Sequence, residues 1–172
     1  LPNNILKKLI NLKVIFSMGA GVDHVLKLKN YNNKIPIIRI KDPIMGKRIA
    51  NYALAQILNY QLNFKIFQNA QNKKYWSGER TPIDNENLTI GILGLGFLGN
   101  HIAKLLLMLN YNVIAYKRTQ KKISDLQVYT GKNIKNFIKK SDIIISILPS
   151  TEYTNNFIDK NFIKLMKTKS CL

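Results

Sequence analysis

The chain has 172 residues, of which 46% are hydrophobic and 21% are charged, a composition typical of a soluble globular protein with one ordinary domain core. Its formal net charge of +18 would attract nucleic acid, anionic membranes or phosphorylated ligands. Only four of the 27 basic residues are Arg, however, and the lysines are spread along the whole chain. We therefore expect no nucleic-acid partner.

Two further features bear on the location of the protein. No window approaches the roughly 20 apolar residues of a membrane helix, so we predict no membrane partner. The single cysteine, Cys171, excludes an intrachain disulfide and fits a cytoplasmic protein. The chain lacks an initiator Met and stops after a basic stretch that looks like the approach to another strand, so we expect it to be cut at both ends.

Two short strands are predicted in the amino-terminal part. Residues 14–17 form an apolar run that leads into the turn 18–23, where two glycines permit a tight bend and bring backbone amides close to a ligand. A second apolar run, residues 35–40, is closed by the turn signal Asp42-Pro43. We therefore place a domain boundary near residue 45.

A long amphipathic helix is predicted from Ile49 past Phe67, because apolar residues recur there at intervals of three and four. The polar residues 71–74 end it. Strand-like runs then alternate with helical patterns, which indicates an α/β fold with a parallel sheet. Asn110 is expected to end a helix in the left-handed conformation, since Asn is the usual substitute for Gly there. The strands are expected at 88–93, 113–116 and 143–148, and the helices at 101–109, 133–140 and 161–167.

A glycine motif, G-x-G-x-x-G, lies directly after a predicted strand and opens a predicted helix. The first Gly permits a tight turn, the second lets the backbone approach a pyrophosphate, and the third lets the helix pack on the strand. The helix start offers free N–H groups to phosphates. A plain glycine-rich turn is the alternative. The candidate cofactor-binding residues are Gly94, Leu95, Gly96, Phe97, Leu98 and Gly99.

A basic turn follows the next predicted strand, where an NAD-binding protein would carry an Asp or Glu for the ribose hydroxyls. Here Lys117, Arg118 and Thr119 occupy that place. Arg118 can hold a 2′-phosphate in a bidentate fork, Lys117 adds a charge and Thr119 a hydroxyl. We therefore predict NADP(H) as the preferred cofactor. The alternative is another solvated basic turn in a lysine-rich chain.

Several stretches resemble the D-isomer-specific 2-hydroxyacid dehydrogenases, and within that family the glyoxylate/hydroxypyruvate reductase A branch. They are residues 12–24, 91–99, 142–154, the Asp42-Pro43 turn leading into 48–52, and the turn 116–119. The resemblance implies part of a flavodoxin-like substrate domain in residues 1–45. Residues 46–172 would be an incomplete Rossmann-type, doubly wound domain, whose long linking helix also forms a homodimer contact.

The resemblance also implies a substrate site and the nicotinamide end of the cofactor site. The backbone amides of Ala20 and Gly21 would bind the substrate carboxylate, although a bare turn is the alternative. The cofactor would be lined by Leu148, Pro149, Ser150 and Thr154. For Thr154, a role at the start of a helix is an alternative. The implied reaction is hydride transfer to the carbonyl carbon of a 2-oxo acid such as glyoxylate or hydroxypyruvate.

The Arg, Glu and His that carry the chemistry in this family would follow the position of Leu172. We therefore predict no catalytic residue and no metal site in this chain, and no reductase activity of the chain alone. His101 is expected beside the phosphate end of the cofactor, and His24, near the substrate loop, has a packing or capping role. Two other hypotheses remain: a non-catalytic cofactor-sensing or partner-binding module, and nucleic-acid binding through the net charge.

Overall fold

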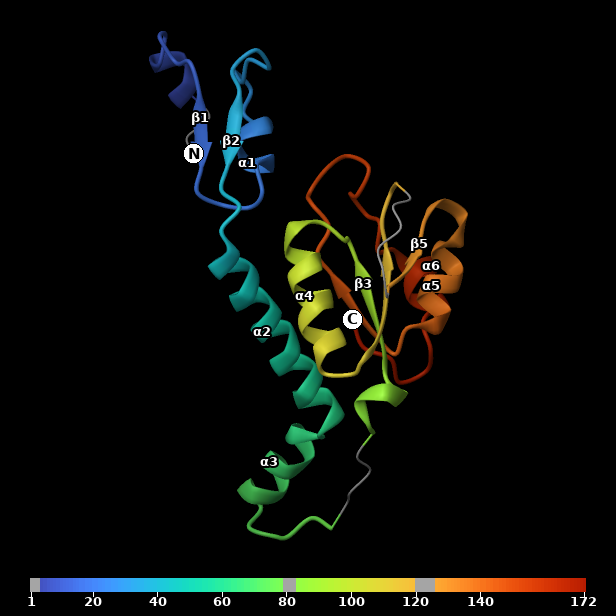
Figure 1. Cartoon of the computed structure of the whole chain (residues 1–172). Helices are drawn as coiled ribbons and strands as arrows, with labels where there is room; N and C mark the ends of the chain where they lie inside the picture. The colour runs from blue at the N-terminus through green and yellow to red at the C-terminus, as the bar shows by residue number, and fades with distance from the viewer. Residues whose placement is uncertain (1–3, 79–82, 120–125) are drawn as a thin grey trace. The chain divides into compact units, whose positions relative to one another are not determined.

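The computed structural model describes residues 4–78, 83–119 and 126–172. Two compact units make up the chain (Figure 1). The first comprises Leu1–Pro43 and Pro149–Phe157, and the second Ile44–Leu148 and Ile158–Leu172. The assignment of residues 1–45 to a substrate domain and of 46–172 to a cofactor domain stays a prediction.

The first unit holds a two-stranded parallel sheet of β1 (Ile15–Ser17) and β2 (Ile37–Arg39). The register places Ser17 beside Arg39 at the end of the pair. The strands are preceded by the 3-10 helix η1 (Ile5–Lys8), and the connection between them contains the short helix α1 (Asp23–Leu26). Both strands were expected from their apolar runs, whereas α1 was not.

The second unit is built on a four-stranded parallel sheet in the order β5-β4-β3-β6. Helix α4 lies on one side of this sheet, and α5 and α6 lie on the other (Figure 1). This arrangement confirms the predicted α/β class with a doubly wound parallel sheet. The strands are β3 (Thr89–Leu93), β4 (Asn112–Tyr116), β5 (Gln127–Tyr129) and β6 (Ile143–Ser146). The helices are α4 (Phe97–Met108), α5 (Ile134–Lys140) and α6 (Lys160–Leu165), with 3-10 turns η2 (Asn85–Asn87) and η3 (Gly131–Asn133).

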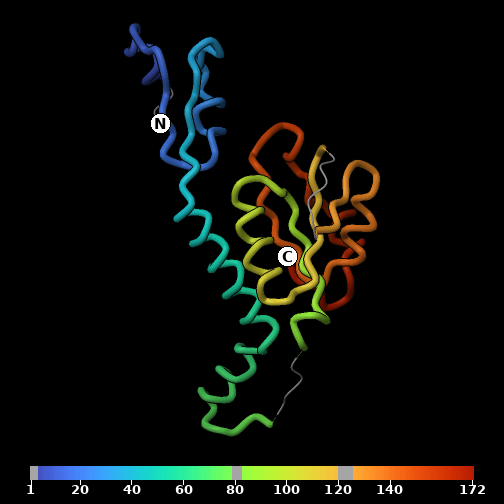
Figure 2. The backbone as a smooth tube through the Cα atoms, viewed as in Figure 1, coloured from blue at the N-terminus to red at the C-terminus, as the bar shows by residue number. Residues whose placement is uncertain are grey.

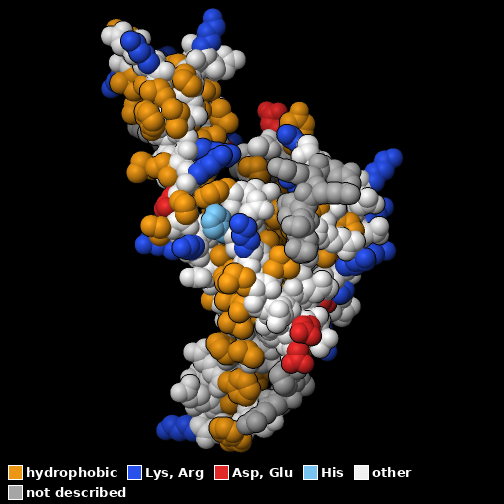
Figure 3. Space-filling model, in the orientation of Figure 1, with side chains coloured by type: hydrophobic (Ala, Val, Ile, Leu, Met, Phe, Trp, Pro, Cys, Tyr) orange, Lys and Arg blue, Asp and Glu red, His pale blue; other side chains and the backbone are white. Residues whose placement is uncertain are grey.

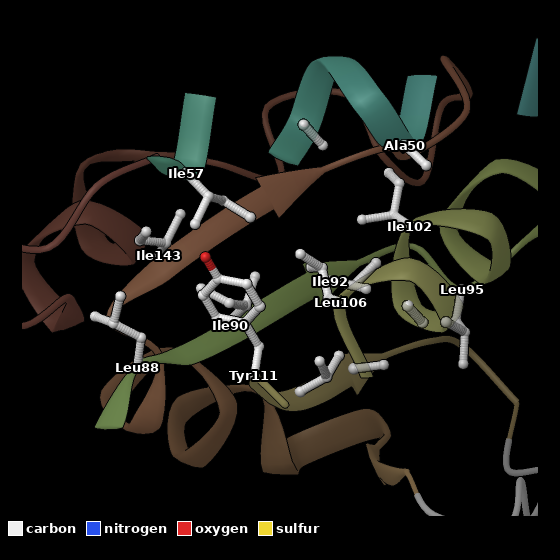
Figure 4. Packing of buried hydrophobic residues seen from close by; sticks show 14 residues of the cluster. Ala50, Ile57, Leu88, Ile90, Ile92, Leu95, Ile102, Leu106, Tyr111 and Ile143 are labelled. Atoms are coloured by element: carbon white, nitrogen blue, oxygen red, sulfur yellow. The ribbon is translucent and has the colours of Figure 1, made fainter. Parts of the chain in front are cut away.

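The core lies around β3, which is covered on both faces. Ile90 and Ile92 are fully buried and pack in one cluster with side chains of α4 and of the long helix before it (Figure 4). On the other face, Gly91 lies against Ser141 and Phe137. Burial on both faces explains why β3 is continuously apolar from Ile90 to Leu93 rather than alternating.

The single long helix predicted from Ile49 past Phe67 is wrong. The structure has two helices, α2 (Pro43–Gln61) and α3 (Phe64–Asn72), separated by a change of direction (Figure 2). Asn63 adopts a left-handed conformation with φ 54°, which ends helical geometry. The Gln61 side chain is buried and bonded to Tyr111 and Asn85, so tertiary contacts fix where α2 stops.

One predicted helix end is confirmed, and one strand was not predicted. Asn110 has φ 60°, as predicted for the end of α4. The edge strand β5 was missed because three residues of alternating character give little sequence signal. None of the helices in the described part of the chain is long and apolar enough to cross a membrane.

Candidate functional site

The glycine loop begins with a sharp turn at the end of β3. Gly94 has φ +111°, a conformation that residues with a side chain rarely adopt. A Cβ added there would lie 2.9 Å from the carbonyl oxygen of Ile147, which follows β6. The Gly94 amide donates to the Tyr116 carbonyl at 3.0 Å, so the turn is also fixed to β4.

The other two motif glycines have opposite surroundings. A Cβ on Gly99 would lie 2.2 Å from the Gly94 carbonyl oxygen, so the first turn of α4 packs directly on the loop. A Cβ on Gly96 would meet nothing within 4 Å. The loop is therefore closed on its protein side and open at Gly96, where a bound group could approach the backbone. The side chain of Leu95 is buried, and those of Phe97 and Leu98 are half-buried.

The start of α4 suits an anion. Gly96 is the N-cap and provides no side-chain cap, and the first turn contains no acidic residue. The N–H groups of this turn therefore remain available, and they add to the partial positive charge of the helix start. A phosphate group matches both features.

His101 lies one turn into α4 and is held by neighbours that are not acidic. Its Nδ1 is 2.9 Å from the Phe97 carbonyl oxygen, and its ring meets that of Phe97 edge to face. The ring also covers Gly46 of α2, where an added Cβ would lie 2.7 Å from it. This is a packing position rather than that of a proton donor paired with a carboxylate.

The basic turn lies at the same end of the sheet as the glycine loop, because Tyr116 pairs with Leu93 in the register of β4 and β3. The Lys117 amide donates to the Tyr129 carbonyl at 3.1 Å, which fixes the turn to β5. Lys117 is half-buried, and Arg118 and Thr119 are exposed. The structure thus brings together two of the elements that the sequence singled out.

The end of β6 completes this edge. The Ile147 amide donates to the Leu93 carbonyl, and the Leu148 nitrogen would lie 3.2 Å from a Cβ on Gly94. Pro149, Ser150 and Thr154 belong to the other unit, where Pro149 and Ser150 are exposed. The Thr154 hydroxyl accepts from the Thr151 amide at 2.9 Å and donates to the Pro149 carbonyl, so it orders this turn. It caps no helix, since α6 begins later, at Lys160.

The turn after β1 is organised differently. The Ser17 hydroxyl lies 3.3 Å from the Gly19 carbonyl oxygen and 3.2 Å from that of Gly21. The Arg39 guanidinium donates to the Ala20 carbonyl at 3.4 Å. Sequence reasoning singled out Ala20 and Gly21 and missed Ser17 and Arg39, although a polar residue that ends an apolar strand was a usable signal.

His24 follows this turn in α1 and is exposed, so the packing role considered for it is not observed. Its neighbour Asp23 is paired with Lys27 at 4.0 Å. Within the described ranges, no group of three His, Cys, Asp or Glu side chains could hold a metal ion.

A cavity of about 980 Å³ lies in the second unit. It is bounded by α2, α3 and β6, and no residue of the loop or of the basic turn lines it. Along α2 and α3, hydrophobic side chains also gather on the surface (Figure 3). At the cavity, the Tyr60 hydroxyl donates to the Lys169 carbonyl, and burial raises the pKa of Tyr60. The lining is largely apolar, and its basic side chain is that of Lys65.

A parallel sheet whose first strand ends in this glycine turn, beside a basic turn on the next strand, defines a Rossmann-type dinucleotide-binding fold. Residues 54–172 match the family model described as "D-isomer specific 2-hydroxyacid dehydrogenase, NAD binding domain". The chain therefore belongs to this family, and the resemblance seen in its sequence is confirmed.

Individual relatives agree with this assignment. The chain is 32% identical over 168 residues to a glyoxylate/hydroxypyruvate reductase A from an Enterobacter species, covering 94% of this chain and 54% of the relative. A probable 2-hydroxyacid dehydrogenase from Rhizobium etli was solved with NADP, HEPES and L(+)-tartaric acid. Its TM-score is 0.89 at 29% identity, and the match covers 98% of this chain and 52% of the dehydrogenase. An NADPH-dependent glyoxylate/hydroxypyruvate reductase from Sinorhizobium meliloti was solved with NADP and sulfate. Its TM-score is 0.90 at 25% identity, and the match covers 96% of this chain and 52% of the reductase. The chain thus spans about half the length of these relatives.

Proposed function

We propose that this chain is the NADPH-binding part of a reductase that converts a 2-oxo acid, of the glyoxylate or hydroxypyruvate type, to the D-2-hydroxy acid. The observation that carries the proposal is the open position at Gly96 beside the uncapped start of α4, next to a turn that contains Arg118 and no carboxylate. The names of the relatives, which include NADP complexes, support this substrate class and this cofactor.

The cofactor-binding residues would divide their roles by position. Backbone N–H groups of residues 95–99 would hold the pyrophosphate, and Arg118 would hold the 2′-phosphate in a bidentate fork, with Lys117 and Thr119 as additional donors. The loop from Leu148 through Ser150, braced by Thr154, would face the nicotinamide half. When bound, NADPH supplies the hydride for the reaction.

The substrate carboxylate would be bound by the backbone of Ala20 and Gly21. A homodimer through α2 is part of the proposal and is supported by exposed apolar side chains along α2 and α3, among them Tyr52 and Phe64. We further propose that this polypeptide alone does not reduce glyoxylate. His101 lies against a backbone carbonyl, and among the described residues neither it nor His24 has an ion-pair partner such as the carboxylate that would keep an imidazole charged near neutral pH.

The proposal is tested by titrating the chain with NADPH and NADH, followed by nicotinamide fluorescence. We expect NADPH to bind more tightly, and Arg118→Ala to weaken NADPH binding by roughly 10- to 100-fold, as for loss of hydrogen bonds to a charged group. NADH binding should be unchanged, because it lacks the 2′-phosphate.

The matched control is Arg48→Ala, which removes the same charge from an exposed position on α2. It should leave both affinities unchanged. Equal binding of NADH and NADPH by the wild-type chain would overturn the cofactor assignment. The same samples, assayed with glyoxylate and NADPH, should show no turnover.

A further inference from the structure

The turn after β1 has an unusual division of its polar groups. The carbonyl groups of Gly19, Ala20 and Gly21 all lie within hydrogen-bonding distance of side chains at the ends of β1 and β2. The amides of the same three residues donate to no group in the described part of the chain. Successive amides without acceptors form a concave donor surface of the kind that binds anions.

An acidic side chain lies beside this turn and opposes anion binding there. A Cβ added to Gly21 would lie 3.1 Å from Asp23 Oδ1, so the Asp23 carboxylate is close to the backbone of Gly21. Asp23 is only loosely paired, with Lys27 at 4.0 Å, and both side chains are substantially exposed to solvent. The amides alone would therefore bind a carboxylate weakly, since like charges repel at this range.

Arg39 supplies the compensating charge. It ends β2 opposite Ser17 in the register, its side chain is exposed, and it has no ion-pair partner among the residues described. One N–H of its guanidinium reaches the Ala20 carbonyl. The planar group has five N–H donors, so others remain available for a carboxylate, in a geometry that an ammonium group does not offer.

We propose that Arg39 is a substrate-binding residue. Its guanidinium holds the Ala20 carbonyl, which orients the three amides outward, and it contributes a charged donor to the carboxylate of the 2-oxo acid. This inference rests on the proposed function, because that proposal gives the turn its ligand. It adds a side chain to a site that otherwise consists of backbone.

The experiment uses the full chain labelled with 15N and titrated with glyoxylate, while the amide signals of Gly19, Ala20 and Gly21 are followed by NMR. The wild-type chain should show saturable shifts at these three amides. Arg39→Gln, which keeps donors but loses the charge, should weaken binding about tenfold. Arg39→Lys, which keeps the charge but loses the planar fork, should bind with intermediate affinity.

Arg48→Gln is the matched control and should bind glyoxylate as the wild type does. If Arg39→Gln binds like the wild type, or if both Gln variants weaken binding equally, the proposal is overturned, because only diffuse charge would then be acting. Absence of shifts in the wild-type chain would also overturn it. That result would leave the cofactor assignment intact, since NADPH binding is measured separately. Unchanged amide signals in the remainder of residues 4–43 would show that the variants keep the fold. If Arg39→Gln does not keep the fold, the comparison of Arg39→Lys with the wild type decides instead.

Discussion

The two glycine turns of this chain follow parallel strands in the same way but are held by different forces. In the turn after β3, backbone fits against backbone: a Cβ on Gly94 would approach the Ile147 carbonyl, and one on Gly99 the Gly94 carbonyl. In the turn after β1, a Cβ on Gly19 would make only ordinary contacts at 3.8 Å, and side chains fix the carbonyls instead.

The difference shows two ways to expose backbone amides to an anion. Close packing at Gly94 and Gly99 restricts the turn after β3, and the start of the 12-residue helix α4 adds its partial charge. The turn after β1 leads into a helix of only four residues, so it depends on hydrogen bonds from Ser17 and Arg39. Substitutions of glycine should therefore damage the first turn, and substitutions of polar side chains the second.

The largest expected effect is that of Gly99→Ala. The added Cβ meets a backbone oxygen that cannot move without opening the loop, so the free energy of unfolding should fall by about 3 kcal/mol in urea titrations followed by circular dichroism. Gly96→Ala has open space around it and should cost less than about 1 kcal/mol, while weakening NADPH binding. Equal destabilisation by the two variants would show that close packing does not hold this turn.

A smaller effect is expected from Ser17→Ala. Ser17 is buried, and its loss leaves the Gly19 and Gly21 carbonyls without their partner, at a cost of about 1 kcal/mol. Faster hydrogen exchange of the amides in residues 15–22, with unchanged exchange in β3 and α4, would be the signature. Ser150→Ala removes an exposed hydroxyl and should leave both regions unchanged. A Ser17 variant with wild-type exchange would remove the distinction between the turns.

The smallest effect concerns the contrast between helix starts. Unlike α4, helix α6 has a side-chain cap, since the Asp159 carboxylate accepts from the Phe162 amide at 2.7 Å. This hydrogen bond lowers the pKa of Asp159 below its ordinary value of 3.8. A lowered pKa in the folded state means that the cap stabilises the helix above that ordinary value and is lost as the pH falls through the lowered one.

The measurement is the amide signal of Phe162 as a function of pH. It should move in acid with the protonation of Asp159, together with a slight loss of α6 structure. Asp159→Asn keeps an acceptor oxygen without the titration, so its Phe162 signal should stay constant over the same range. A wild-type signal that does not change with pH would contradict the capping role.

Much of the second unit could be read from the sequence because its signals are local. The strand, the three glycines and the helix of the β3–α4 connection follow one another without a gap, and each glycine has a role fixed by its spacing. Asn110 ends α4 as predicted because a left-handed residue is a local preference. The basic turn was found in the same way, by its distance from the glycines.

What the sequence determined by itself is therefore the class of fold and the family, since both depend on patterns of neighbouring residues. Tertiary structure alone decided the break at Asn63, where the apolar pattern continues but buried Gln61 is bonded to Tyr111, 50 positions away in the chain. It also decided that Arg39 lies beside the turn after β1. That contact joins residues 19 positions apart and exists because β1 pairs with β2, and no local pattern encodes such a pairing.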